Sequence, residues 1–147
     1  KENTVQSLSF NILEGKKVQE DLTFKKHIVT KNRIETYFNR SYKTQMKKSP
    51  SHLIFLSSLI NLQKMIYILM CDRLKISYNP KGDEKLKIWP TKVDIQMNGL
   101  IRKKNDLMQD FELNSIEKIT STKYYISGKS SAESTVFIKG DAFVYTI

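Results

Sequence analysis

LIFLSSLINLQKMIYILMC, residues 53–71, decides the fold of this chain. A helix drawn through it is apolar on more than one face in nearly every turn. Ser49 is placed to cap such a helix and Pro50 stands at its first helical position. A helix that is apolar all round is buried all round. We therefore expect a central buried helix near residues 50–72.

Three polar residues interrupt the apolar stretch: Asn61, Gln63 and Lys64. A lysine in the middle of a membrane span costs roughly 2.5–3.5 kcal/mol, so the segment indicates a helix buried in protein and no membrane span. Buried polar groups need partners. Asn61 and Gln63 therefore either bond to the sheet backbone or line a cavity, and Lys64 is expected to reach a surface or a dimer edge.

The sequence on both sides of the helix alternates between apolar and polar residues, as strands do. Within 85–101, for example, Val93, Ile95 and Met97 alternate with polar side chains. Residues 32–38 fit either a helical turn or a strand, and 39–49 are polar and basic, which predicts a loop. Ser127-Gly128 and Lys139-Gly140-Asp141 predict turns or bulges. The expected strands are 5–13, 18–30, 85–101, 106–119, 122–129 and 133–147.

This order of elements predicts an α+β fold in which an antiparallel sheet wraps around one long helix. With 147 residues, the chain has the usual length of one domain, so residues 1–147 are expected to form a single domain. The single cysteine, Cys71, excludes an intrachain disulfide and favours a reducing, cytoplasmic setting. His27, His52 and Cys71 form no zinc signature, and neither a metal nor a cofactor is expected.

The charge is strongly basic, with 25 Lys and Arg against 15 Asp and Glu and a formal net charge of +10. Such a surplus favours an acidic partner, which includes nucleic acid, an anionic membrane surface, a phosphorylated cofactor and an acidic carrier protein. Lysine predominates over arginine, the residue that reads bases and phosphates in bidentate fashion. Sequence-specific DNA recognition is therefore not favoured.

The segment QMKKSPSHLIFLSSLINLQ, residues 45–63, resembles the loop and helix of the beta-hydroxyacyl-acyl-carrier-protein dehydratase family, which has the hotdog fold. That family carries the phrase His-Phe-Pro-Gly-x-Pro-x-Met-Pro-Gly, then a helix with a Glu and, four residues later, a Gln. Pro50 and Gln63 fall on the family's Pro and Gln. Residues 14–30 and 122–147 resemble its second strand and closing hairpin. Acylthioesterases of the same fold share the pattern of a helix within a sheet.

Two departures from the family concern its chemistry. Gln45 stands at the position of the catalytic His, and Leu59 stands at that of the helix carboxylate. Dehydration of a 3-hydroxyacyl thioester needs a base and an acid, and neither Gln nor Leu supplies one. If the alignment is shifted by several residues, Tyr42 or His52 enters the site instead. The catalytic candidates are thus Gln45, Tyr42 and His52. The candidate substrate-binding residues are Pro50, Leu59 and Gln63.

The resemblance implies a protein that binds an acyl thioester on acyl carrier protein or coenzyme A, in fatty-acid or polyketide-type metabolism. It also implies a homodimer or a paired second hotdog domain, because a sheet edge must be paired, charged or covered. Whether the chain is an enzyme stays open between a dehydratase-like and a thioesterase-like fold. The alternative from another class is a non-enzymatic basic adaptor that binds nucleic acid or an acidic protein.

Overall fold

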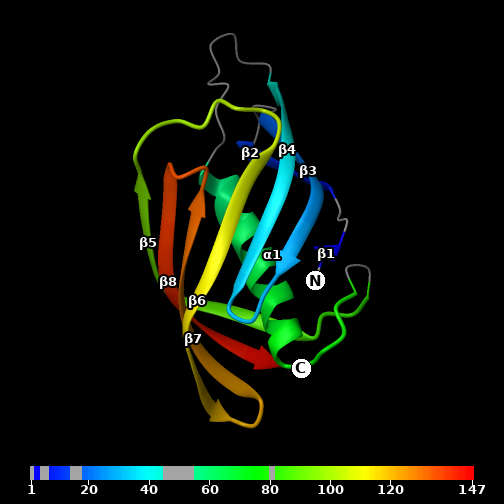
Figure 1. The fold of residues 1–147 in the computed structure, drawn as a ribbon, viewed down its shortest axis with the longest axis vertical. Helices are drawn as coiled ribbons and strands as arrows, with labels where there is room; N and C mark the ends of the chain where they lie inside the picture. Colours follow the sequence, from blue (N-terminus) through cyan, green and yellow to red (C-terminus); the bar gives the residue numbers. More distant parts are fainter. Residues whose placement is uncertain (1, 4–6, 14–17, 45–54, 80–81) are drawn as a thin grey trace.

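The computed structural model describes residues 2–3, 7–13, 18–44, 55–79 and 82–147. They form one helix and eight strands (Figure 1). In chain order these are β1 (Glu2–Asn3), β2 (Ser7–Leu13), β3 (Val18–Val29), β4 (Arg33–Thr44), α1 (Phe55–Arg73), β5 (Leu86–Met97), β6 (Leu107–Thr120), β7 (Lys123–Ala132) and β8 (Val136–Thr146).

All described strands pair antiparallel in one sheet of order β1-β3-β4-β6-β7-β8-β5, and β2 also pairs with β3. The helix follows β4, yet β4 pairs with β6, whereas β5 pairs with β8 at the far end of the sheet. The chain therefore crosses the sheet after the helix, and α1 lies along one face of it (Figure 1). The predicted α+β fold, with an antiparallel sheet around one helix, is confirmed.

The expectation of a helix buried all round is confirmed only in part. Met65 and Leu69 are fully buried, but Ile66 is half-buried and Gln63 is exposed. The sheet lies along one side of α1 (Figure 1), and Leu59, Ile66 and Tyr67 of the helix are only partly buried where they pack against the core. In the part of the chain that the structure describes, no helix is long and apolar enough to cross a membrane.

The loop predicted for 39–49 is wrong as far as Thr44, because β4 continues through these residues. Arg40 shows why the pattern misled. Its side chain is only 4% exposed, and its guanidinium donates to the carbonyl oxygens of Lys103 at 2.9 Å and Arg102 at 3.2 Å. A polar side chain thus takes an inward position and holds the β5–β6 connection, which hydrophobic alternation alone does not reveal.

Strand β5 has an apolar face that the described residues cover only in part. Val93, Ile95 and Met97 pair with Gly140, Ile138 and Val136 of β8, so they share the helix side of the sheet with those residues. The alternation predicted for 85–101 is present. These three side chains are nevertheless 40–44% exposed, because α1 does not extend over the β5 edge.

Candidate functional site

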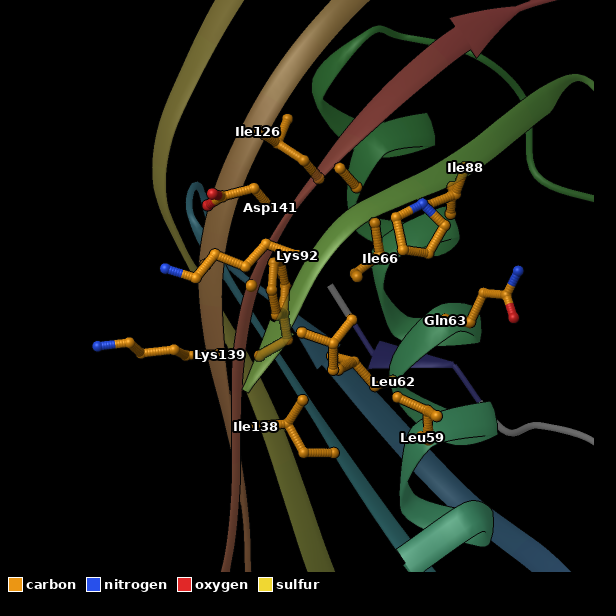
Figure 2. Close-up of a pocket in the computed structure, with 16 residues that line it drawn as sticks. Leu59, Leu62, Gln63, Ile66, Ile88, Lys92, Ile126, Ile138, Lys139 and Asp141 are labelled. Atoms are coloured by element: carbon orange, nitrogen blue, oxygen red, sulfur yellow. The ribbon is translucent and has the colours of Figure 1, made fainter. Parts of the chain in front are cut away.

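A cavity of about 180 Å³ lies between α1 and the strands at the β5 end of the sheet (Figure 2). Leu59, Leu62 and Ile66 point into it from the helix, and Ile138 faces them from β8. Ile88, Pro90, Val93, Phe111, Ile126 and Ala142 complete its apolar lining. The cavity therefore offers an apolar surface to a ligand.

The polar side chains at this cavity point away from its interior. Figure 2 shows the amino groups of Lys92 and Lys139 and the carboxylate of Asp141 directed away from the helix. Asp141 accepts a hydrogen bond from Ser127 Oγ at 2.6 Å, which holds its carboxylate outside the cavity. No charged group of the described lining residues thus faces a ligand bound between helix and sheet.

Two glycines in register line this cavity. Gly128 of β7 pairs with Gly140 of β8, so both lie inside strands. Of the predicted turns or bulges, the turns are wrong, and register shifts lie in the strands opposite, between Leu113 and Ser115 of β6 and between Pro90 and Lys92 of β5. A Cβ on Gly128 would come within 2.4 Å of the Phe111 ring, and one on Gly140 within 2.2 Å of the Lys92 carbonyl oxygen. Gly140 faces the bulge of β5 between Pro90 and Lys92. Any larger residue would displace the cavity wall.

The structure brings together two of the residues proposed from sequence. Leu59 and Gln63 both line the cavity, one turn apart on α1. The Gln63 amide points away from the sheet, so it lies at the rim (Figure 2). Tyr42 lies in β4, paired with Glu20 of β3. Gln45, Pro50 and His52 lie outside the described residues.

A buried hydrogen-bond network fixes the helix to the sheet beside the cavity. Asn61 Nδ2 donates to Thr36 Oγ1 and Gln109 Oε1, each at 3.1 Å. Gln109 Nε2 donates to the Ser58 carbonyl oxygen at 2.9 Å and to Ser130 Oγ at 3.0 Å. All five residues are at most 3% exposed. Asn61 is therefore a structural residue, bonded to side chains of the sheet and not to the sheet backbone as the sequence predicted.

Sequence reasoning did not identify the sheet side of this network. Thr36, Gln109 and Ser130 each occupy an inward position of a strand, between apolar neighbours such as Leu107 and Phe111. The available signal was a glutamine at an inward position of an alternating strand, facing a helix that carries a buried Asn. Such a pair gives each buried amide a partner in the other element.

Lys64 does not reach the surface or a dimer edge, as the sequence suggested. Its Nζ lies 4.3 Å from the centroid of the Phe24 ring, is buried, and has no hydrogen-bond partner among the described residues. Burial lowers the pKa of Lys64 from 10.5 to about 8, because desolvation disfavours the charged form. The helix thus holds an ammonium group over an aromatic face, and no anion among the described residues pairs with it.

Cys71 is buried and free, and burial raises the pKa of its thiol. A thiol of this kind is a poor nucleophile at neutral pH, because the thiolate is the reactive form. Within the described ranges no three His, Cys, Asp or Glu side chains are grouped to hold a metal ion.

Comparison with solved structures shows the fold. A mutant form of a thioesterase from Pseudomonas aeruginosa superposes with a TM-score of 0.50 at 7% identity, over 86% of this chain and 82% of that one. A thioesterase from Haemophilus influenzae gives a TM-score of 0.49 at 7% identity, over 86% and 78% of the two chains. This chain has the hotdog fold that the sequence predicted.

The comparisons with known proteins establish the fold and no family. No family model matches the sequence, and no curated protein matches it. The dehydratase resemblance is therefore not confirmed. At this identity the structural likeness carries over no residue of a catalytic site.

The buried network predicts that Gln109→Leu destabilises the fold by about 1–3 kcal/mol, because it removes the donor to the buried Ser130 hydroxyl and one acceptor of the buried Asn61 amide. Urea unfolding followed by circular dichroism measures this loss. The matched control is Gln63→Leu on the exposed rim, which we expect to change stability by less than about 0.5 kcal/mol. Equal effects of the two substitutions would contradict the structural role given to Gln109.

The burial of the Lys64 amine predicts that the free energy of unfolding depends on pH. Below about pH 8 the amine is charged in the folded and the unfolded chain, so desolvation of the charged amine lowers the free energy of unfolding by its full amount. As the pH rises from about 8 towards 10.5, the folded chain has lost this proton and the unfolded chain still holds it, so stability rises. Lys64→Met should therefore be more stable than the wild type at pH 7, and this advantage should shrink above pH 8.

Unfolding midpoints between pH 6.5 and 10 test this expectation, with Lys87→Met at an exposed position of β5 as the control. An advantage of Lys64→Met that stays constant over this range would show that the amine is not buried in solution.

Proposed function

We propose that this chain binds an acyl group carried as a thioester on acyl carrier protein or coenzyme A, in fatty-acid or polyketide-type metabolism. The observation that carries the proposal is the apolar cavity between Leu59, Leu62 and Ile66 of the helix and Ile138 of the sheet. Ligand pockets are mostly apolar, with polar groups at the edge, and Gln63 lies at such an edge. A net charge of +10 favours the anionic carriers of acyl groups.

The size of the cavity favours a short acyl chain. Its volume of about 180 Å³ is below the roughly 300–1,000 Å³ of pockets that enclose drug-sized ligands. Each methylene group that moves from water into the cavity contributes about 0.8 kcal/mol. Affinity should therefore rise with chain length while the chain still fits, and then level off.

We propose that the chain binds the acyl thioester but does not catalyse the standard dehydratase reaction. Leu59, at the position of the family's helix carboxylate, presents an alkyl side chain to the cavity. Proton transfer by general acids and bases contributes typically 10²–10⁴-fold to such reactions, and a leucine supplies none of it. The free Cys71 thiol fits the reducing, cytoplasmic setting that belongs to this proposal.

The exposed edge strand supports a dimer as part of the same proposal. The outer edge of β5 pairs with no described strand, and its residues Val93, Ile95 and Met97 are exposed on the helix side. An edge of this kind invites pairing with another strand. In an antiparallel pairing of two copies centred on Val93, Lys92 lies opposite the second copy's Asp94. A second hotdog domain of a longer chain would satisfy the same edge.

The cavity predicts that Leu59→Trp weakens binding of butyryl-coenzyme A at least about tenfold. Excluding two methylene groups costs about 1.6 kcal/mol, and 1.4 kcal/mol corresponds to a factor of ten. Isothermal titration calorimetry measures the affinity. The control is Ile60→Trp, the next residue on α1, whose side chain does not line this cavity.

Two outcomes would contradict the proposal. One is equal binding by the two tryptophan variants. The other is binding of duplex or single-stranded nucleic acid with a steep dependence on salt concentration and no binding of acyl-coenzyme A, which would favour the basic adaptor.

Pairing of two copies along the outer edge of β5 predicts that Lys92→Glu weakens dimerisation roughly tenfold. The two pairs formed by residue 92 of one copy and Asp94 of the other change from opposite to like charge. The double variant with Lys92→Glu and Asp94→Lys should restore the dimer, because the charges are again complementary. Analytical ultracentrifugation over a range of concentrations gives the dissociation constants. A wild-type chain that stays monomeric at high concentration, with no paired domain, contradicts this part of the proposal.

A further inference from the structure

Beside the apolar cavity, α1 borders a second one of about 370 Å³. Gln63 lines both cavities, and Lys64 lines the second. Tyr67, one turn further along the helix, and Tyr78, in the segment after it, lie on the wall of the second cavity. Gln63 and Lys64 both line the second cavity, so a ligand that extends past the Gln63 rim of the first cavity enters the space that the Lys64 side chain borders.

The amine of Lys64 is in an unusual state for a lysine. Its contact at 4.3 Å is with the face of the Phe24 ring, and the described residues offer its Nζ no hydrogen bond. Asp83 and Glu84 line the same cavity, but no ion pair joins either of them to Lys64. With a pKa of about 8 in place of 10.5, roughly half of the amine is neutral at pH 8, against roughly 0.3% for an ordinary lysine.

Loss of the proton also frees the amine to move. A cation is attracted to the face of an aromatic ring by its charge, so the neutral amine no longer has this attraction to Phe24. Its side chain already lines the second cavity, and rotation about its flexible stem turns Nζ into that space. A desolvated, neutral lysine is an activated nucleophile.

We propose that Lys64 is an acyl-acceptor site, which takes the acyl group of a thioester bound in the neighbouring apolar cavity; this inference rests on the proposed function. The neutral Nζ attacks the thioester carbonyl carbon. An N–C bond forms, the C–S bond breaks, and the proton that leaves the nitrogen goes to the departing thiolate. The products are an Nε-acyl-lysine and the free thiol of the carrier.

The product is better suited to this environment than the starting amine. An ammonium group buried without an anion carries a desolvation cost, and the amide is neutral. The titratable groups that share the cavity are Tyr67, Tyr78, Asp83 and Glu84. The reaction consumes only the bound thioester, so it needs no oxidant, metal or further reactant.

The experiment incubates the chain with butyryl-coenzyme A at pH 8 and maps acylated lysines by peptide mass spectrometry, with the released thiol measured in parallel. We expect acylation of Lys64 at least about tenfold above the mean of the exposed lysines, one thiol released per acyl group, and a rate that rises with a midpoint near pH 8. Lys64→Arg and Lys64→Met should abolish this signal. Lys123→Arg is the control, because Lys123 Nζ also lies 4.3 Å from an aromatic centroid, that of Phe143.

A second measurement separates this inference from the proposed function. The thioether S-butyl-coenzyme A cannot transfer an acyl group, and its binding to the wild type and to Lys64→Met is measured by calorimetry. Binding to both proteins, with acylation spread over exposed lysines or absent, overturns the acceptor role alone. If neither protein binds S-butyl-coenzyme A, the proposed function is overturned, and with it the site that would hold the acyl donor. Binding together with selective acylation that Leu59→Trp slows supports the inference.

Discussion

Gln109 of β6 donates hydrogen bonds to the Ser58 carbonyl oxygen of α1 and to Ser130 of β7, so that one side-chain amide joins the helix to two strands. Asn61 of the helix donates back to Gln109 and to Thr36. Apolar burial is non-directional and would allow the helix to slide over the sheet. Directional bonds between fully buried amides select one position, because any other would leave these groups without partners.

The position of the helix determines where the cavity is. With α1 held over β4, β6 and β7, its residues Leu59, Leu62 and Ile66 face the part of the sheet where Gly128 and Gly140 lie side by side. Because these two residues carry no Cβ, the Phe111 ring and the Lys92 carbonyl oxygen lie directly against the strands there. The same placement leaves the β5 edge uncovered, so the cavity and the exposed apolar face of β5 have one common origin.

Much of this architecture could be predicted from the sequence, since the apolar stretch 53–71 and the alternating flanks are strong local signals. The expected strands 5–13, 18–30, 85–101 and 106–119 correspond closely to β2, β3, β5 and β6. Leu59 and Gln63 were named from the resemblance, and both line the cavity. The burial of Arg40 and Lys64 could not be predicted, because it depends on residues distant in sequence that supply carbonyl oxygens or an aromatic face. The glycine pair was misread because its role depends on two strands in register.

The central claim is that an acyl chain binds between α1 and β8. A crystal structure of the chain with S-butyl-coenzyme A tests it most directly. We expect electron density for the butyl group between Leu62 of the helix and Ile138 of the sheet, with the sulfur near the Gln63 rim. A butyl group bound on the exposed face of β5 or on the outer face of the sheet, with the cavity empty, would contradict it.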